Sequence, residues 1–499
     1  MTQRIRTDSY FIDYIFIICT GLFIFSPCLF NFFVSDDFIW IRKGSTLSFN
    51  QFFYGSRDSA YNIFRPLVPV LFFVLHRAFE LSPFGYHLSS ILLHILNALL
   101  FYRILSHFPL TKNMIVLSSI IFVSHFAHEE TVFWISSISI PLCGLFYLLS
   151  VFIFLKWLKN RRAWFYLLSL ASGVVAFFIR EDAVTLPLIL SFIIGLTYFP
   201  SDQVILNGPS PKRRITALIS AIPFFLLIVF YLKLRNLGLP HLGFGSLFSL
   251  NPANLLKNGI YFIVNLVIPI RLIFDMIGYQ YSAMINSTLR NIGSNLFVVM
   301  FASLGTASLI WVLFVWFKKT NKVFRLLGVT FFIILFPYLF FNGYGLRFTY
   351  FPVMGFSLIG SYLMVSGLET VTKRSRYSLK SYVHLLMIVI LVFNFLILFE
   401  RNRWWTKAST ICEETITNAG RVVSSSPTGS VVYFMELPSR LHGAYILNNG
   451  FVEAMNLFYP LDNHQIKTIE SGNLPLLKSG QLENRHLFKY ENGEFRKLF

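Results

Sequence analysis

Two adjacent carboxylates, Asp36 and Asp37, directly follow a long apolar run and precede further apolar residues, in the sequence VSDDFIW. Neighbouring carboxylates can raise the pKa of one of the pair, so that it can act as a general base. Together they can also bind a divalent cation such as Mg²⁺ or Mn²⁺. Either aspartate could be the base, the metal ion is an open alternative, and a solvated helix cap explains this pair alone equally well.

Three more polar groups stand where apolar runs end, in SHFAHEETVFWIS, FFIREDAVTLP and NGYGLRFTYFPVMGF. Their ionisable residues are His128, Glu129 and Glu130; Arg180, Glu181 and Asp182; and Arg347. Arginine can bind a phosphate through two hydrogen bonds and does not lose its charge. Each group alone also fits a polar loop tip or an interfacial anchor. If the groups converge, they predict a site that binds an anionic substrate.

The elements that must position these groups are transmembrane helices. Hydrophobic residues make up 55% of the 499 residues and charged residues 13%, with a mean hydropathy of +0.63, whereas soluble domains carry about a quarter charged residues. A helix of about 20 apolar residues crosses a bilayer. The apolar runs predict about eleven spans, at 11–34, 86–105, 113–127, 132–155, 163–179, 183–199, 215–234, 293–317, 326–341, 348–367 and 380–399.

Basic residues between the runs predict which side each gap faces. Lys and Arg are enriched in cytoplasmic loops, and clusters of them stand at 4–6, 103–112, 156–162, 212–214, 318–325 and 373–376. The remaining gaps are therefore extracytoplasmic, namely 35–85, 128–131, 180–182, 235–292, 342–347 and everything after about 400. This topology has a cytoplasmic N-terminus and places all four polar groups on one face, where the first loop adds Arg65.

One apolar segment, Leu255–Asp275, does not fit as a further span, because counting it would move the basic cluster at 318–325 to the outer face. We interpret it as re-entrant or interfacial. Such a break in a membrane helix must satisfy its backbone against protein or water. We therefore expect it to line a cavity within the outer loop 235–292.

The formal charge of +19 indicates topology rather than nucleic-acid binding, because the excess lies in the membrane portion of the chain. Cys19, Cys28 and Cys143 fall in apolar runs and Cys412 stands alone. This pattern predicts no disulfide framework and no cysteine metal site.

The composition changes after about Trp405, where Gly, Asn and polar residues return. The pattern predicts a helix through Ala408–Ala419 and a short strand at Ser430–Met435. We therefore expect two domains, a membrane domain at 1–404 and a small extracytoplasmic α/β domain at 405–499.

The order of these motifs resembles a known family. FVSDDFIW, FRPLVPVLFFVLHRAFELSPFGYHLSSILLHILNALL, HFAHEETVFWISS, FIREDAVTLP and LRFTYFPVMGF are similar, in order and spacing, to motifs of the GT-C superfamily of lipid-phosphosugar-dependent glycosyltransferases. The nearest likeness is to the branch of tetratricopeptide-carrying transmembrane O-mannosyltransferases. It covers about residues 10–400, but no tetratricopeptide repeat follows here and the α/β tail is not the usual appendage of that branch.

The resemblance implies an all-α membrane fold with a polyprenyl-phosphate sugar donor and an active site on the periplasmic or luminal side. It implies that Asp36 or Asp37 is the general base and that Arg347 faces the donor phosphate. Glu129, Glu130, Arg180 and Glu181 would line the site. It also implies an interfacial helix over Arg65–Glu80, which agrees with an apolar stripe there.

Together with this resemblance, these features predict an inverting glycosyltransferase of the membrane that acts on a glycan, lipid or protein acceptor. We expect it in the bacterial inner membrane, and we expect no nucleic-acid partner. The sequence leaves the sugar, the acceptor and any Mg²⁺ or Mn²⁺ cofactor open. A transporter or flippase for a lipid-linked or anionic solute is the alternative, favoured by the broken segment at 255–275. A membrane scaffold that presents its C-terminal domain would give the two aspartates no role.

Overall fold

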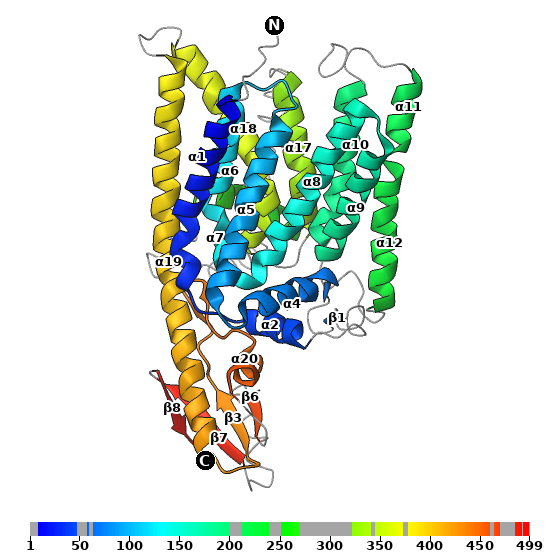
Figure 1. The fold of residues 1–499 in the computed structure, drawn as a ribbon. Coiled ribbons are helices and arrows are strands. Elements are labelled where there is room, and N and C mark those ends of the chain that lie inside the picture. The colour runs from blue at the N-terminus through cyan, green and yellow to red at the C-terminus, as the bar shows by residue number, and fades with distance from the viewer. Residues whose placement is uncertain are drawn as a thin grey trace.

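The computed structural model describes residues 8–46, 57–58, 63–198, 211–238, 251–269, 322–340, 345–372, 378–459, 464–469, 485–491 and 493–498. Within them, long helices form a bundle, and a group of strands lies beyond one end of it (Figure 1). We call this end of the bundle the sheet end. The architecture agrees with the predicted helical membrane protein that carries a small C-terminal α/β region.

The bundle helices within the described residues are α1 (Asp8–Phe25), α5 (Pro83–Leu105), α6 (Lys112–Ser124), α8 (Ser139–Asn160), α9 (Ala163–Ile179), α10 (Leu186–Tyr198), α12 (Ile222–Gly238), α17 (Lys322–Leu339), α18 (Tyr350–Thr372) and α19 (Leu379–Ser425). The bundle helices from α1 to α12 alternate in direction along the chain, and so do α17, α18 and α19 (Figure 1). A short helix, α11 (Pro211–Ile219), precedes α12 at the opposite end from the sheet. Each predicted span within the described residues overlaps one of these helices.

In the part of the chain that the structure describes, six helices are long and apolar enough to cross a membrane by length and composition. They are Tyr10–Phe30, Pro83–Leu105, Ile135–Asn160, Ile215–Asn236, Leu346–Thr370 and Ser381–Ser425. Shorter apolar helices add Lys112–Ser124, Ala163–Ile179 and Gly328–Leu339 to the bundle. The predicted span at 293–317 lies outside the described residues, so the number of eleven spans stays a prediction.

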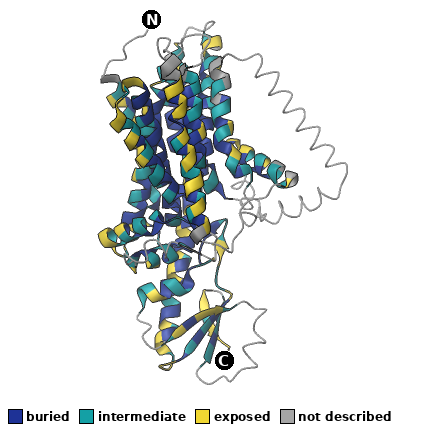
Figure 2. Cartoon of the chain, turned by 90° about the vertical axis from the view of Figure 1, so that its right-hand side faces the viewer, coloured by how far each residue is buried: buried dark blue, intermediate teal, exposed yellow. Residues whose placement is uncertain are grey.

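The outer surface of the bundle is apolar, as a lipid environment requires. On α19, large apolar side chains are about half exposed at Leu385, Ile388, Val389, Val392 and Leu396. Buried residues face the inside of the bundle, while exposed ones lie on its outside (Figure 2). Large apolar side chains can stay on the surface where lipid acyl chains cover them. The apolar surface therefore indicates an integral membrane protein.

Small and polar side chains join the helices inside the bundle. Asn97 of α5 donates to the Pro141 carbonyl of α8 at 2.7 Å and to the Tyr350 hydroxyl of α18 at 2.8 Å. Ser118 of α6 and Ser361 of α18 are hydrogen-bonded at 2.6 Å. Because lipid is as apolar as leucine, such bonds and close packing hold membrane helices together where hydrophobic burial cannot.

Two amphipathic helices, α2 (Asp37–Ser45) and α4 (Leu67–Phe79), lie across the sheet end of the bundle (Figure 1). On α4, Val68, Phe72 and Leu75 are buried, whereas Val74 is exposed. This spacing is that of one helix face. The helix predicted over Arg65–Glu80 is therefore present. A two-strand hairpin, β1 (Arg57–Asp58) and β2 (Ile63–Phe64), precedes it.

Short helices complete the sheet end. They are η1 (Ser26–Phe30), η2 (Phe126–His128), α7 (Glu129–Phe133), η3 (Ile135–Ile138), η4 (Glu181–Thr185) and η6 (Leu346–Thr349). The predicted re-entrant segment begins within α13 (Pro252–Val267), whose Asn258 donates to the Leu339 carbonyl of α17 at 2.7 Å. Its part beyond residue 269 lies outside the described residues, so re-entry into the membrane stays a prediction.

The C-terminal region, residues 426–498, contains a four-stranded sheet. Its strands are β3 (Val431–Met435), β6 (Gln465–Ile469), β7 (Arg485–Glu491) and β8 (Glu494–Lys497), in the order β6-β3-β7-β8. Strand β3 is parallel to β6 and β7, and β8 is antiparallel to β7. A hairpin of β4 (Arg440–Leu441) and β5 (Ala444–Tyr445) leads to α20 (Phe451–Phe458). The predicted strand at Ser430–Met435 is confirmed by β3.

Helix α19 connects the bundle to the C-terminal region without a break. It has 47 residues, which corresponds to about 70 Å at the rise of an α-helix. The predicted boundary between residues 404 and 405 falls inside it, and so does the helix predicted over Ala408–Ala419. The C-terminal region is thus carried on a helix that also packs in the bundle.

A buried ion pair fixes α19 at the sheet end. Arg401 Nε donates to one oxygen of Glu129, and its Nη2 donates to the other at 3.1 Å. Both side chains are almost fully buried, with exposed fractions of 1% and 3%. Two hydrogen bonds between planar groups orient both partners, so this pair sets the position of α19 against α7.

Replacing Arg401 by Met should lower thermal stability markedly, because a buried carboxylate that loses its cation costs about 3–5 kcal/mol. Thermal unfolding of the purified protein in detergent measures the effect. Adding Glu129→Gln should restore part of the loss. The control is Arg403→Met on the same helix, because Arg403 pairs with Glu400 at an exposed position where such pairs contribute little. Equal losses in the two single variants would contradict the assignment.

Candidate functional site

The carboxylate of Asp37 is a structural anchor at the sheet end. Its Oδ1 accepts hydrogen bonds from the backbone N–H and the hydroxyl of Ser136, at 2.7 and 2.5 Å. Its Oδ2 accepts from the backbone N–H of Val34 at 2.9 Å. The side chain is fully buried. Asp37 therefore ties the start of α2 to the segment between α7 and α8.

Asp36 lies beside Asp37 but in a more open position. It is half-buried, and its Oδ1 accepts a hydrogen bond at 2.9 Å from the side-chain amide of Asn449. Because Asp36 is partly accessible while the oxygens of Asp37 already accept three donors, Asp36 is the aspartate that a substrate can approach. The geometry thus distinguishes the two aspartates by their access, which the sequence could not do.

Burial raises the pKa of Asp37 to about 7, against the opposing effect of its hydrogen bonds with Ser136 and Val34. The neighbouring charge of Asp36 raises it further. Asp37 lies outside the span Tyr10–Phe30, at the start of the helix that crosses the sheet end. A carboxyl group with this pKa changes its charge close to neutral pH.

Arg347 forms the centre of a second group. Its Nη1 lies 3.5 Å from Glu130 Oε2, and its backbone N–H donates to the same oxygen at 3.3 Å. Nη1 also donates to the hydroxyl of Tyr445 at 3.2 Å. The guanidinium lies over the rings of Trp134 and Phe348. About a quarter of the Arg347 side chain is exposed, so it combines long contacts with access from outside.

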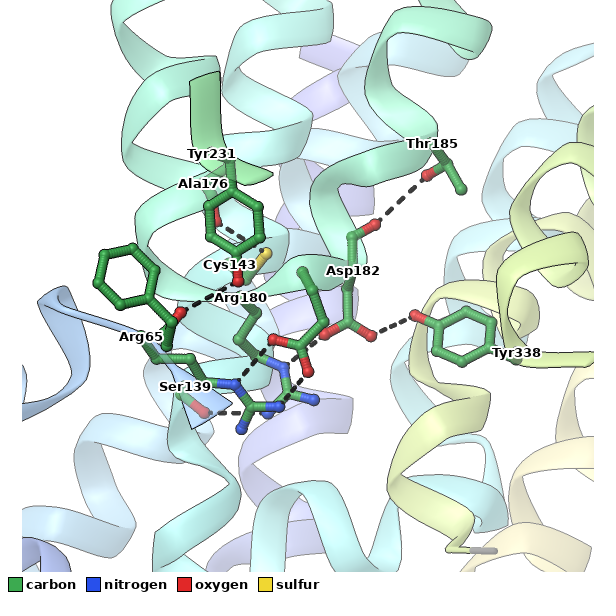
Figure 3. A network of polar contacts seen from close by, with 11 residues as sticks. Arg65, Ser139, Cys143, Ala176, Arg180, Asp182, Thr185, Tyr231 and Tyr338 are labelled. Atoms are coloured by element: carbon green, nitrogen blue, oxygen red, sulfur yellow. Dashed lines mark hydrogen bonds and ion pairs between the residues drawn. The ribbon is translucent and has the colours of Figure 1, made fainter. Parts of the chain in front are cut away.

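A third group joins η4 to the helices around it (Figure 3). Arg65 donates through two nitrogens to the two oxygens of Glu181, at 2.9 Å for the bond from Nε. Arg180 pairs with Asp182 at 2.5 Å, and the other oxygen of Asp182 accepts from the Tyr338 hydroxyl at 2.5 Å. Burial alone would raise the pKa of Glu181, but the charge and hydrogen bonds of Arg65 lower it to about 2. Glu181 is therefore ionised and paired.

The first two groups share neighbours. Ser136, which donates to Asp37, is two residues from Trp134, on which Arg347 lies. Asn449, which donates to Asp36, is four residues from Tyr445, which accepts from Arg347. The pair Asp36–Asp37 and Arg347 therefore contact the same two segments, 134–136 and 445–449. Arg180 is close enough to Arg347 for their charges to repel each other.

Two candidate residues lie apart from this cluster. His128 is fully buried among aromatic rings, with its ring centroid 4.7 Å from that of His94, 4.9 Å from Tyr350 and 5.1 Å from Phe122. Glu129 pairs with Arg401 of α19, as described above. Both residues pack inside the bundle or against α19. Glu130, their neighbour in sequence, faces Arg347.

The hydrogen-bond donors around Asp37 do not suit a metal ion. Among the described residues, no group of three or more His, Cys, Asp or Glu side chains could hold one. The oxygens of Asp37 face backbone and hydroxyl donors, whereas a divalent cation needs oxygens without such donors. We therefore derive no chemical step through Mg²⁺ or Mn²⁺.

An apolar cavity of about 130 Å³ lies within the bundle between α5, α8, α10, α17 and α18. Its lining includes Phe101, Tyr147, Ile193 and Met354. The hydroxyl of Tyr147 is hydrogen-bonded to Thr185 of η4 at 3.1 Å. One residue of the cavity wall is therefore bonded to the short helix that carries Glu181 and Asp182, while the lining continues to the loop 108–110 between α5 and α6.

Several residues of the cluster were not predicted from the sequence. Ser136 is the last residue of the predicted motif SHFAHEETVFWIS, and Tyr338 lies four residues before the motif NGYGLRFTYFPVMGF. Tyr445 and Asn449 had no such signal, because they lie about 100 residues beyond Arg347 in a polar tail. Only the docking of the C-terminal region against the sheet end brings them to the site.

No protein-family model and no curated protein sequence matches this chain. Among solved structures, it is similar to ArnT from Cupriavidus metallidurans in two states. The structure bound to undecaprenyl phosphate has a TM-score of 0.48 and 8% identity, and covers 98% of this chain and 98% of that one. The apo structure has a TM-score of 0.48 and 9% identity, with coverages of 98% and 94%. At this level, the likeness establishes neither a common fold nor a common activity.

The raised pKa of Asp37 predicts a pH-dependent stability. The folded protein keeps the Asp37 proton up to a pH of about 7, whereas the unfolded chain loses it near pH ~4. The stabilisation from this group is therefore complete at low pH and is lost as the pH rises through 7. Between pH ~5 and ~8, the melting temperature of the wild type should fall relative to that of Asp37→Asn. A constant difference would contradict the assignment.

Proposed function

We propose that this chain is an inverting glycosyltransferase of the membrane. It moves a sugar from a polyprenyl-phosphate or polyprenyl-diphosphate donor to a hydroxyl group of a glycan, lipid or protein acceptor. One observation carries the proposal: the accessible carboxylate of Asp36 and the arginine Arg347 both contact the segment 445–449 at one end of an apolar bundle. A general base and a cation for a departing phosphate are the two groups that this reaction needs.

Asp36 is the proposed general base. As the acceptor oxygen forms a bond to the anomeric carbon, its proton must leave, and a carboxylate within hydrogen-bond reach can take it. The hydrogen bond from Asn449 holds the Asp36 side chain in one orientation. Asp37 holds the backbone of this segment through Ser136 and Val34. One displacement without a covalent intermediate inverts the configuration of the sugar.

Arg347 is the proposed partner of the leaving group. The bond from the anomeric carbon to the phosphate oxygen breaks with its electron pair, so the lipid phosphate gains negative charge. A guanidinium already in position stabilises that charge without reorganisation. Arg65 and Arg180 are held by Glu181 and Asp182, whereas the contact of Arg347 with Glu130 is longer. Arg347 is therefore the arginine that can exchange its partner for phosphate most readily.

The apolar cavity supports a lipid-linked donor. It has almost no polar lining. The hydroxyl of its wall residue Tyr147 is hydrogen-bonded to Thr185 of η4, the short helix that follows Arg180. A ligand with a charged head and a hydrocarbon chain could place its head among the arginines and its chain in the bundle. We assign this end to the extracytoplasmic side, because the basic gaps of the sequence lie at the opposite end of the helices.

The experiment is to incubate purified protein with a panel of polyprenyl-phosphate sugars and to follow release of the lipid phosphate by transfer or hydrolysis. One active donor would support the proposal. Movement of lipid-linked solute across vesicles without turnover would support the transporter alternative instead.

With an active donor, Asp36→Asn should reduce turnover by a factor of about 10²–10⁴, because the general base is lost. Expression and melting temperature should stay close to those of the wild type. The control is Asp13→Asn, at the opposite end of the bundle, where Asp13 accepts from Tyr102 and pairs with Lys112. Full activity of Asp36→Asn would rule out its role as the base.

Arg347→Ala should reduce turnover by a factor of about 10²–10³, the usual effect of losing one group that stabilises developing negative charge. It should also weaken binding of undecaprenyl phosphate while leaving binding of undecaprenol, which has no phosphate, unchanged. Both affinities can be measured by thermal shift or fluorescence titration in detergent. An equal loss for the two lipids would indicate damage to the fold instead.

A further inference from the structure

The C-terminal region contacts the proposed active site directly. Asn449 donates to Asp36 at 2.9 Å, and the hydroxyl of Tyr445 accepts from Arg347 at 3.2 Å. Both residues belong to the loop 445–450, by which we mean the segment from the end of β5 to the start of α20. One loop of the C-terminal region therefore holds both side chains to which we assign the reaction.

The same loop also fixes the backbone that precedes Asp36. Ser35 has a φ of +50°, a left-handed conformation that non-glycine residues adopt only when their surroundings impose it. Its N–H donates to the carbonyl of Ile446 at 2.7 Å. Its own carbonyl lies so close to Gly450 that a Cβ there would come within 2.3 Å of the oxygen. The loop thus imposes the turn that presents Asp36.

Tyr445 is itself held rigidly. Its ring stacks on Trp134 with centroids 4.4 Å apart, and the guanidinium of Arg440 lies 4.4 Å from its centroid. The side chain is 6% exposed. Since Arg347 also lies over Trp134, the tyrosine hydroxyl and the indole together define where the guanidinium points.

We propose that the loop 445–450 of the C-terminal region completes the active site, with Asn449 as the positioning residue for Asp36 and Tyr445 as the positioning residue for Arg347. This inference rests on the proposed function. It assigns to the C-terminal region a part in the reaction itself, beyond that of an appended domain. Activity then depends on docking of this region against the sheet end.

Two glycines of the C-terminal region offer a matched test of docking. Gly450 has a φ of +80° and faces the Ser35 carbonyl, whereas Gly429 has a φ of +84° and a Cβ added to it would meet nothing within 4 Å. An alanine is conformationally strained at both positions, but only Gly450→Ala pushes on Ser35. We expect Gly450→Ala to speed hydrogen exchange of the Ser35 amide and to cut turnover at least about tenfold, while Gly429→Ala keeps wild-type values for both.

The two side chains should have different signatures. Tyr445→Phe removes one hydrogen bond to a charged group, so it should weaken binding of undecaprenyl phosphate about tenfold or more without changing binding of undecaprenol. Asn449→Ala should lower turnover while leaving the affinity for undecaprenyl phosphate unchanged, because it acts on the base. The controls are Tyr433→Phe on β3 and Asn456→Ala at an exposed position of α20, outside the loop. If Tyr445 had a purely structural role, Tyr445→Phe would lower the affinities for undecaprenyl phosphate and for undecaprenol equally.

The possible results separate the two proposals. If the wild type binds undecaprenyl phosphate and the variants at 445, 449 and 450 behave like their controls, the inference is overturned and the proposed function stands. If the wild type shows no phosphate-dependent binding and no turnover, the proposed function fails, and the positioning roles fail with it. Hydrogen exchange at Ser35 in Gly450→Ala still decides in that case whether the loop holds the backbone before Asp36.

Discussion

The need to partner every buried charge governs the sheet end of this protein. A carboxylate or guanidinium out of water costs several kcal/mol unless an opposite charge or enough hydrogen-bond donors face it. Asp37, Glu129 and Asp182 are all nearly fully buried, and each has such partners from a segment far away in the chain. Each pairing therefore connects two elements. The contacts that avoid the desolvation penalty of a buried charge also set the positions of these elements relative to one another.

This constraint divides the ionisable residues into two sets. Asp37 and the pair Glu129–Arg401 are enclosed and have their hydrogen bonds satisfied, so they hold the frame. Asp36 and Arg347 are partly accessible, and the contact of Arg347 with Glu130 is long. A reacting group must exchange its partner for substrate, which an enclosed pair cannot do without leaving a charge unpaired. Accessibility thus distinguishes the proposed catalytic residues from their supports, although the two sets are neighbours in sequence.

The C-terminal region has a similar double role. Helix α19 spans the bundle and continues to the sheet, so the region is carried on a rigid connection whose position Arg401 sets. From there, its loop 445–450 reaches back to Ser35, Asp36 and Arg347. A site made from the start of α2, from η6 and from this loop requires that all three be in place at once. The small sheet that follows the membrane bundle thereby becomes part of the same assembly as the proposed catalytic residues.

The sequence by itself determined the membrane class, the apolar spans that overlap the bundle helices within the described residues, and the grouping of charges at the ends of apolar runs, because hydrophobic length and charge placement act locally along the chain. It placed Asp36, Arg180 and Arg347 as candidates for the same reason. Only the tertiary structure decided that Asp36 rather than Asp37 is accessible, that Glu130 rather than Glu129 faces Arg347, and that Tyr445 and Asn449 join them. Those outcomes depend on which side of a short helix points inward and on contacts between residues far apart in the chain, and no local pattern encodes either.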